Sequence, residues 1–252
     1  MTFTICDNSK TASFFIEESL ANLAIHKFGH NTDIDTASTP ETIWGGGGDY
    51  TGQNTSVATT IDVISDSTDD DGGGIGALTV LVQGLDANYD RIEETITMNG
   101  TSAVTSSGSF LRAFRVIVKT AGSSGHNVGE ITIYENGASA NVFAVMPVTT
   151  NQTLICAYTI PNGFTGCLVG WTASITGTGS SRDGDLSILV RPEGEVFQTK
   201  TLTTVYDTSF FFENLVTPIC LLSKSDIKIQ CTRVSSNNTG MRATMSIVLI
   251  AN

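Results

Sequence analysis

Two histidines and two aspartates near the N-terminus are residue types that could form a metal site. His26 and His30 stand four residues apart and precede Asp33 and Asp35. Two histidines at this spacing face one ion only on a helix, and Gly29 together with the polar residues after it argues against a helix. We therefore expect no metal or other cofactor here, and we interpret the segment as a docking arm with polar contacts.

Three consecutive aspartates, Asp69, Asp70 and Asp71, offer carboxylate oxygens of the kind that bind calcium. Their spacing does not follow the alternating ligand positions of a calcium-binding loop. Three glycines follow directly. The sequence therefore favours a solvated acidic turn over a calcium site.

The sequence gives little support for the acids and nucleophiles of an enzyme active site. Glu93 and Glu94 are adjacent on a predicted strand, so they point to opposite faces, whereas a glycosidase needs two carboxyl groups flanking one bond. Glu193 and Glu195 lie in a stretch with the composition of a turn. His126 lies in a loop-like run, and the chain has no G-x-S-x-G nucleophile elbow. We expect a protein that is not an enzyme.

The strands that would position these groups are clearest between residues 77 and 100. Every second residue from Leu78 to Val82 is apolar, and from 92 to 98 every second residue except Glu94 is apolar. This is the two-residue period of half-buried strands. Residues 86–88 supply a polar turn between the two runs. The stretch predicts a β-hairpin, and Asn99-Gly100 predicts a tight turn into a further strand.

Short β-rich runs separated by turn residues continue to the C-terminus. They predict strands near residues 56–65, 109–120, 130–135, 141–146, 152–159, 165–175, 185–191, 196–204, 209–213, 226–233 and 242–250. The 25 glycines against 5 prolines fit a many-stranded fold with frequent turns. We predict an all-β protein with an N-terminal arm (1–43), a first β domain (44–147) and a second β domain (148–252), both domains being jelly-roll-like β-sandwiches.

The predicted arm has apolar residues at intervals but no hairpin of its own. It must be held by docking onto its own domain or onto a neighbouring subunit. Trp44, followed by four glycines, marks the entry into the first domain. We expect the assembly contacts of the arm to involve Phe14, Phe15, Ile16, His26, Phe28, Asp33, Asp35 and Trp44.

The formal net charge of −12 is distributed unevenly along the chain. Residues 1–147 contain 18 acidic and 6 basic residues, whereas residues 148–252 contain 7 of each. An acidic surface repels nucleic acid and anionic membranes, so we expect neither as a partner. We also expect no signal peptide, because the N-terminus lacks a basic region followed by an apolar one, and hence synthesis in a cytoplasm.

The five cysteines, Cys6, Cys156, Cys167, Cys220 and Cys231, are odd in number and include no C-x-x-C pair. This pattern favours reduced, mostly buried thiols over a disulfide framework or a zinc site.

Several short sequence runs are weak signals singly, but their combination is specific. They are HKFGHNTDIDT at 26–36, PETIW at 40–44 with the glycines before Tyr50, GLDANY at 84–89, NGT at 99–101, SFLR at 109–112, NQT at 151–153, GW at 170–171, RP at 191–192 and SNNTG at 236–240. Together they cover most of the chain, and the sequence resembles structural proteins of marine and freshwater tailed phages.

This resemblance implies a component of the phage particle, made in the host cytoplasm, with no catalytic residues to transfer. We expect a capsid decoration or cement protein that stabilises the head by binding the major capsid protein and sibling subunits, as a homotrimer. The alternative is a head-fibre, tail or baseplate protein. It would bind a host receptor or glycan through exposed aromatic residues such as Tyr50, Tyr89 or Tyr206.

Overall fold

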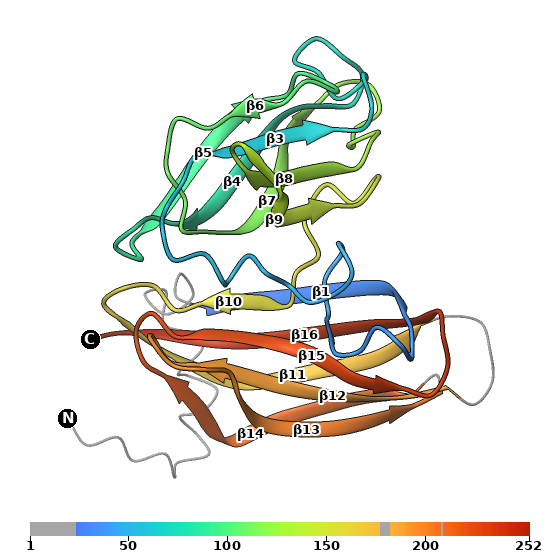
Figure 1. The fold of residues 1–252 in the computed structure, drawn as a ribbon, viewed down its shortest axis with the longest axis vertical. Helices are drawn as coiled ribbons and strands as arrows, with labels where there is room; N and C mark the ends of the chain where they lie inside the picture. The colour runs from blue at the N-terminus through green and yellow to red at the C-terminus, as the bar shows by residue number, and fades with distance from the viewer. Residues whose placement is uncertain (1–23, 177–181, 208) are drawn as a thin grey trace, which may run out of the picture.

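A computed structural model describes residues 24–176, 182–207 and 209–252. Within these ranges the chain forms strands and turns without a helix, and Figure 1 shows the strands gathered into two units. The strands pair antiparallel in both units. The all-β class expected from the alternating apolar residues is therefore confirmed.

The first unit is the upper one in Figure 1 and contains two sheets. Its strands are β3 (Ile61–Ser65), β4 (Ala77–Leu85), β5 (Arg91–Thr97), β6 (Val104–Thr105), β7 (Arg112–Ala121), β8 (Ile131–Glu135) and β9 (Ala138–Met146). One sheet has the order β6-β3-β8-β9 and the other β5-β4-β7. Side chains of both sheets, among them Val63, Val80, Val116 and Ile133, share one buried core.

β4 and β5 form the hairpin that the sequence predicts. Val82 of β4 lies opposite Glu94 of β5. Glu94 interrupts an otherwise apolar strand face, and its carboxylate accepts hydrogen bonds from the backbone N–H groups of Ser107 and Gly108. The acidic residue is tolerated because the neighbouring loop supplies these donors.

The second unit is the lower one in Figure 1 and also contains two sheets. Its strands are β1 (Ala24–Ile34), β2 (Glu41–Thr42), β10 (Ala157–Thr159), β11 (Phe164–Thr176), β12 (Asp183–Arg191), β13 (Gln198–Tyr206), β14 (Phe210–Leu221), β15 (Asp226–Val234) and β16 (Thr239–Ala251). One sheet has the order β1-β16-β11-β14. The other has the order β10-β15-β12-β13, with β2 also paired to β15.

β2 and β10 are two parts of one interrupted strand. β2 lies opposite Gln230 and Cys231 of β15, and β10 lies opposite residues 226–228. Between them the N–H of Cys156 donates to the carbonyl of Ile43 at 3.0 Å. The first unit is thus inserted within a single strand of the second. With β2 and β10 counted as one strand, the sheet orders become 1-8-3-6 and 2-7-4-5, from which we infer a jelly roll of two Greek keys.

The described part of the predicted arm belongs to the second unit. Residues 24–34 form β1, which pairs with β16 from Ala24 opposite Val248 to Ile34 opposite Thr239. Gly29 of β1 lies against the interrupted strand, where a Cβ would stand 1.9 Å from the carbonyl oxygen of Ile43, so only glycine fits. The structure therefore differs from an arm followed by two consecutive domains, because β1 finds its partner strand at the far end of the chain.

A buried ion-pair network joins the two units. Asp226, at the start of β15, lies 3.5 Å from Nε of Arg112 in the first unit and 2.6 Å from Nη2 of Arg191 in β12. Its Oδ1 also accepts a hydrogen bond from the hydroxyl of Thr159 at 2.5 Å. Arg112 donates further to the carbonyl of Thr55. The network satisfies two charges that would otherwise be buried without partners.

The expectation of reduced thiols is wrong for two of the five cysteines. Cys167 in β11 and Cys220 in β14 lie directly opposite each other and form a disulfide. Cys156 and Cys231 are free and buried, and burial raises the pKa of each thiol to about 12. Cys6 lies outside the described residues. Composition could not reveal the pair, because 53 residues separate its members.

We predict that Asp226→Ala lowers the free energy of unfolding by about 3–5 kcal/mol, because it leaves Arg112 buried without a counter-ion. The matched control is Glu193→Ala, which removes the exposed pair with Lys224 and should cost about 1 kcal/mol or less. Denaturant unfolding of both variants measures the difference. A loss for Asp226→Ala as small as that of the control would contradict a stabilising role for the network.

Candidate functional site: a basic cleft between the units

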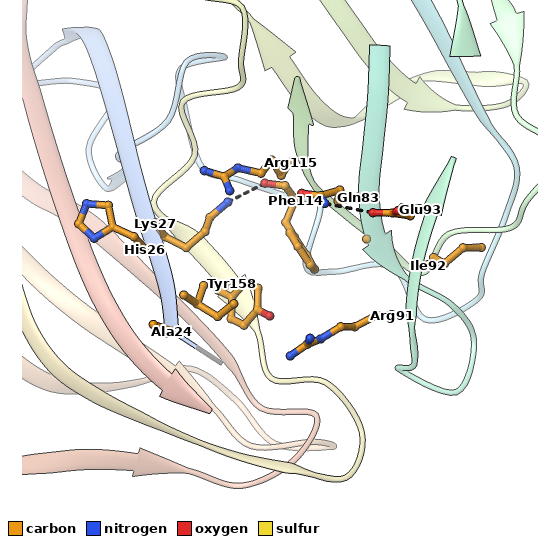
Figure 2. A pocket seen from close by; sticks show the side chains of 12 residues that line it. Ala24, His26, Lys27, Gln83, Arg91, Ile92, Glu93, Phe114, Arg115 and Tyr158 are labelled. Carbon is orange, nitrogen blue, oxygen red and sulfur yellow. Dashed lines mark hydrogen bonds between the residues drawn. The ribbon is translucent and has the colours of Figure 1, made fainter. Parts of the chain in front are cut away.

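A cleft of about 410 Å³ lies between the two units. β1 and β10 of the second unit line one side, and β4, β5 and β7 of the first unit line the other (Figure 2). Its ionisable side chains, apart from one tyrosine, are those of His26, Lys27, Arg91, Glu93 and Arg115.

Lys27 is the buried cation of the cleft, with 5% of its surface exposed. Its Nζ donates a hydrogen bond to the carbonyl of Phe114 at 2.7 Å and stands 5.5 Å from the centre of the Phe114 ring. Figure 2 shows this bond reaching across from β1 to β7. Burial lowers the pKa of Lys27 from 10.5 to about 7, and the neighbouring Arg115 guanidinium contributes to the shift.

Two arginines complete the basic lining. The guanidinium carbon of Arg115 lies 6.0 Å from the centre of the Phe28 ring, and that of Arg91 lies 4.9 Å from the Phe164 ring. Aromatic faces therefore hold both side chains. Within the described ranges, no carboxylate lies within 4 Å of Arg91, Arg115 or Lys27.

The residue types of the lining suit anion binding. Glu93 is its one acid, and this carboxylate accepts a hydrogen bond from Nε2 of Gln83 at 3.2 Å. Two arginines and Lys27, which is charged below a pKa of about 7, stand against it, and guanidinium and ammonium groups bind carboxylates through charge-assisted hydrogen bonds. The lining has no serine, threonine or cysteine that could act as a nucleophile. Among the described residues, no group of three His, Cys, Asp or Glu is placed to hold a metal ion.

The structure describes five of the eight predicted arm residues, and it brings only His26 and Phe28 together. His26 and Phe28 alternate along β1 and so share one face. Asp33 lies near the end of β1. Asp35 lies just after β1, and its carboxylate accepts a hydrogen bond from the backbone N–H of Asn238. Trp44 is buried in the core of the first unit. Phe14, Phe15 and Ile16 lie outside the described residues.

Both N-terminal histidines contact hydroxyl groups. Nδ1 of His26 lies 3.2 Å from Oγ of Ser246, and Nε2 of His30 lies 3.3 Å from Oγ1 of Thr176. They stand on a strand, as the argument against a helix expects. Burial and the Arg242 guanidinium lower the pKa of His30.

The interpretation of residues 69–71 as a solvated turn is wrong for Asp70, which is fully buried. Its two carboxylate oxygens accept hydrogen bonds from the Ser65 hydroxyl and from the backbone N–H groups of Ala77, Val128 and Gly129, at 2.7–2.9 Å. The carboxylate therefore ties three chain segments together. A run of acidic letters does not reveal such backbone donors.

The tyrosines considered for receptor binding differ in their surroundings. Tyr50 is buried and donates a hydrogen bond to a backbone carbonyl. The centre of the Tyr89 ring lies 5.7 Å from the guanidinium carbon of Arg112 and 5.5 Å from Nζ of Lys224. Tyr206 is 63% exposed. Of the three, Tyr206 presents most surface to a ligand.

Sequence reasoning missed Lys27, Arg91 and Arg115 as a group. They come from three different strands, and no motif links them. The composition gives no signal for the group: residues 1–147 contain only six basic residues, but that three of these line one cleft is seen only in the structure.

These features define a two-unit β protein with a basic cleft between the units. No protein-family model and no curated protein sequence matches the chain. It is similar to the crystal structure of the infectious bursal disease virus VP2 subviral particle, with 7% identity, a TM-score of 0.23, and 90% of this chain and 72% of that chain covered. For the T13 particle of the same virus the values are 9%, 0.24, 90% and 69%. TM-scores this low support no argument about fold or function. No helix in the described ranges could cross a membrane.

We predict that the stability of the wild type relative to Lys27→Met rises with pH between about 7 and 10. The pKa of Lys27 is lowered in the folded state, so in this window the unfolded chain binds one more proton than the folded protein does. Folding therefore releases a proton and is favoured as the pH rises. The slope should approach about 1.4 kcal/mol per pH unit. Denaturant unfolding at several pH values measures it, and a difference that does not vary with pH would contradict burial of the ammonium group.

We also predict that Asp70→Ala lowers the free energy of unfolding by at least about 3 kcal/mol, because it leaves several buried donors without an acceptor. Asp69→Ala, at the exposed neighbouring position, should change it by about 0.5 kcal/mol or less. Thermal and denaturant unfolding compare the two. Similar small losses would mean that solvent replaces the Asp70 contacts.

Proposed function

We propose that this protein is a non-enzymatic structural component of a tailed-phage particle, specifically a capsid decoration or cement protein that stabilises the head. The observation that carries the proposal is the concentration of exposed apolar side chains on two edge strands of the second unit. The resemblance of the sequence landmarks to phage structural proteins points in the same direction.

The exposed apolar residues concentrate on β13 and β14 and their flanks. Of the eleven large hydrophobic side chains exposed among the described residues, seven lie between positions 196 and 222. They are Val196, Leu202, Tyr206, Phe210, Phe212, Val216 and Leu222. β13 and β14 each stand at the end of a sheet. Exposed sheet edges with apolar side chains are typical surfaces for binding another protein.

The distribution of charge supports docking through the second unit. Residues 148–252, which form most of the second unit, contain seven acidic and seven basic residues, so little net repulsion opposes their approach to another protein. The acidic first unit would then face solvent. We propose the major capsid protein and sibling subunits as partners, with a homotrimer as the assembly unit and synthesis in the host cytoplasm. Weak contacts repeated over a symmetric shell add up through multivalency.

A head-fibre, tail or baseplate protein that binds a host receptor or glycan is the second candidate. The exposed ring of Tyr206 favours it, since an aromatic face can stack on a sugar. Tyr50 is buried and Tyr89 is half-buried, so both offer less aromatic surface for this role than Tyr206 does.

We predict that purified particles contain this protein at a ratio to the major capsid protein near one, or at a simple fraction such as one third. A lattice-wide cement role requires such a ratio, because each repeated site on the shell takes one copy or one trimer. Quantitative mass spectrometry of particles measures it. A ratio of a few per cent or less would reject the cement role in favour of a fibre or tail component.

A further inference from the structure

We propose that the cleft between the two units binds the carboxylate groups of an extended acidic peptide segment. This inference does not rest on the virion role proposed above, because the cleft is formed by a single chain and can be tested with the purified protein.

The first support is local charge. In a chain of net charge −12, the cleft brings Lys27, Arg91 and Arg115 to one place and sets only Glu93 against them. Five cations elsewhere in the described ranges pair with carboxylates, as Arg112 and Arg191 do with Asp226. Gathering partially desolvated cations without counter-ions is unfavourable, and an anion in the cleft would relieve that cost.

The second support is the way the arginines are held. The Phe28 and Phe164 rings lie beside Arg115 and Arg91, so the stacked side chains lose little further freedom when their N–H groups donate to a ligand. The guanidinium fork matches a carboxylate with two parallel hydrogen bonds. Figure 2 shows Arg115 near Lys27, and Arg91 apart from them across the cleft. Two separate basic positions fit a ligand with more than one carboxylate.

The third support is the apolar lining, which favours a peptide over a free anion. Ile25, Ile92, Phe114 and Tyr158 line the cleft together with the basic residues. The methylene groups of glutamate side chains and neighbouring residues can pack against such surfaces. A nucleic acid is disfavoured, since its longer run of phosphates would extend beyond the cleft over the acidic first unit, whereas a peptide of a few residues would not. An acidic peptide of a few residues matches both the charged and the apolar parts.

The test uses a fluorescent hexaglutamate peptide and its hexaglutamine analogue as probes, with binding followed by anisotropy. We expect hexaglutamate to bind the wild type, more weakly as salt rises, and hexaglutamine not to bind. Arg91→Gln and Arg115→Gln should each weaken binding by about tenfold or more. Arg115→Lys, which keeps the charge but loses the fork, should fall between Arg115→Gln and the wild type. The matched control is Lys119→Gln, an exposed cation on the same strand as Arg115 and outside the cleft, which should change affinity less than about twofold.

Three results would overturn the proposal. One is the absence of hexaglutamate binding by the folded wild type. Another is an equal loss of affinity in Lys119→Gln, which would indicate attraction to the surface as a whole. The third is displacement of the peptide by inorganic phosphate at concentrations comparable to the peptide's own dissociation constant, which would assign the cleft to a free oxyanion. The melting temperature of each variant, measured in parallel, confirms that folded proteins are compared.

Discussion

The relation between the two units depends on the burial of one carboxylate. Asp226 receives Arg112 from the first unit and Arg191 and Thr159 from the second. A relative movement of the units would separate Arg112 from Asp226 and leave charge buried without compensation, which costs far more than the loss of an exposed pair. The walls of the basic cleft belong to different units, so the shape of the cleft depends on the same contact.

The insertion explains how the first unit can be added without opening the sheet of the second unit into which it is inserted. The chain leaves the jelly roll after Ile43 and returns at Cys156, and these two residues are hydrogen-bonded to each other. β15 continues its pairing from β2 to β10 across the break. Because both connections leave from one point, the inserted unit is held by two adjacent covalent links, by the Asp226 network and by the hydrogen bond from Lys27 to the Phe114 carbonyl. Gly29 provides the space for this crossing.

Most strands could be predicted because their side chains alternate, and the regions of β4, β5, β11 and β15 correspond closely to the apolar runs. The sequence pattern does not show which strands pair when they lie far apart in the chain. The sequence predicts an arm at residues 24–34 and not a strand of the second unit, because the partner of β1 is the last strand of the chain. β14 runs to Leu221, beyond its predicted end, because an edge strand tolerates Pro218. The same holds for the disulfide, the burial of Asp70 and the basic cleft. Each depends on residues that come together only on folding, so no local sequence pattern predicts it.

The cleft also shows why net charge describes this protein poorly at short range. A polyanion that approaches the first unit is repelled by its acidic residues within about 10 Å, the range over which mobile ions leave charges largely unscreened. Inside the cleft the nearest groups are Lys27, Arg91 and Arg115, in surroundings where water screens them less. This repulsion weakens the binding of a long polyanion, most of which lies outside the cleft, more than the binding of a short acidic peptide. An acidic segment that other contacts carry into place, such as those proposed for the apolar edges of β13 and β14, binds more tightly still. The two proposed surfaces would then act in sequence, the apolar edges supplying proximity and the basic cleft supplying selectivity for acidic side chains.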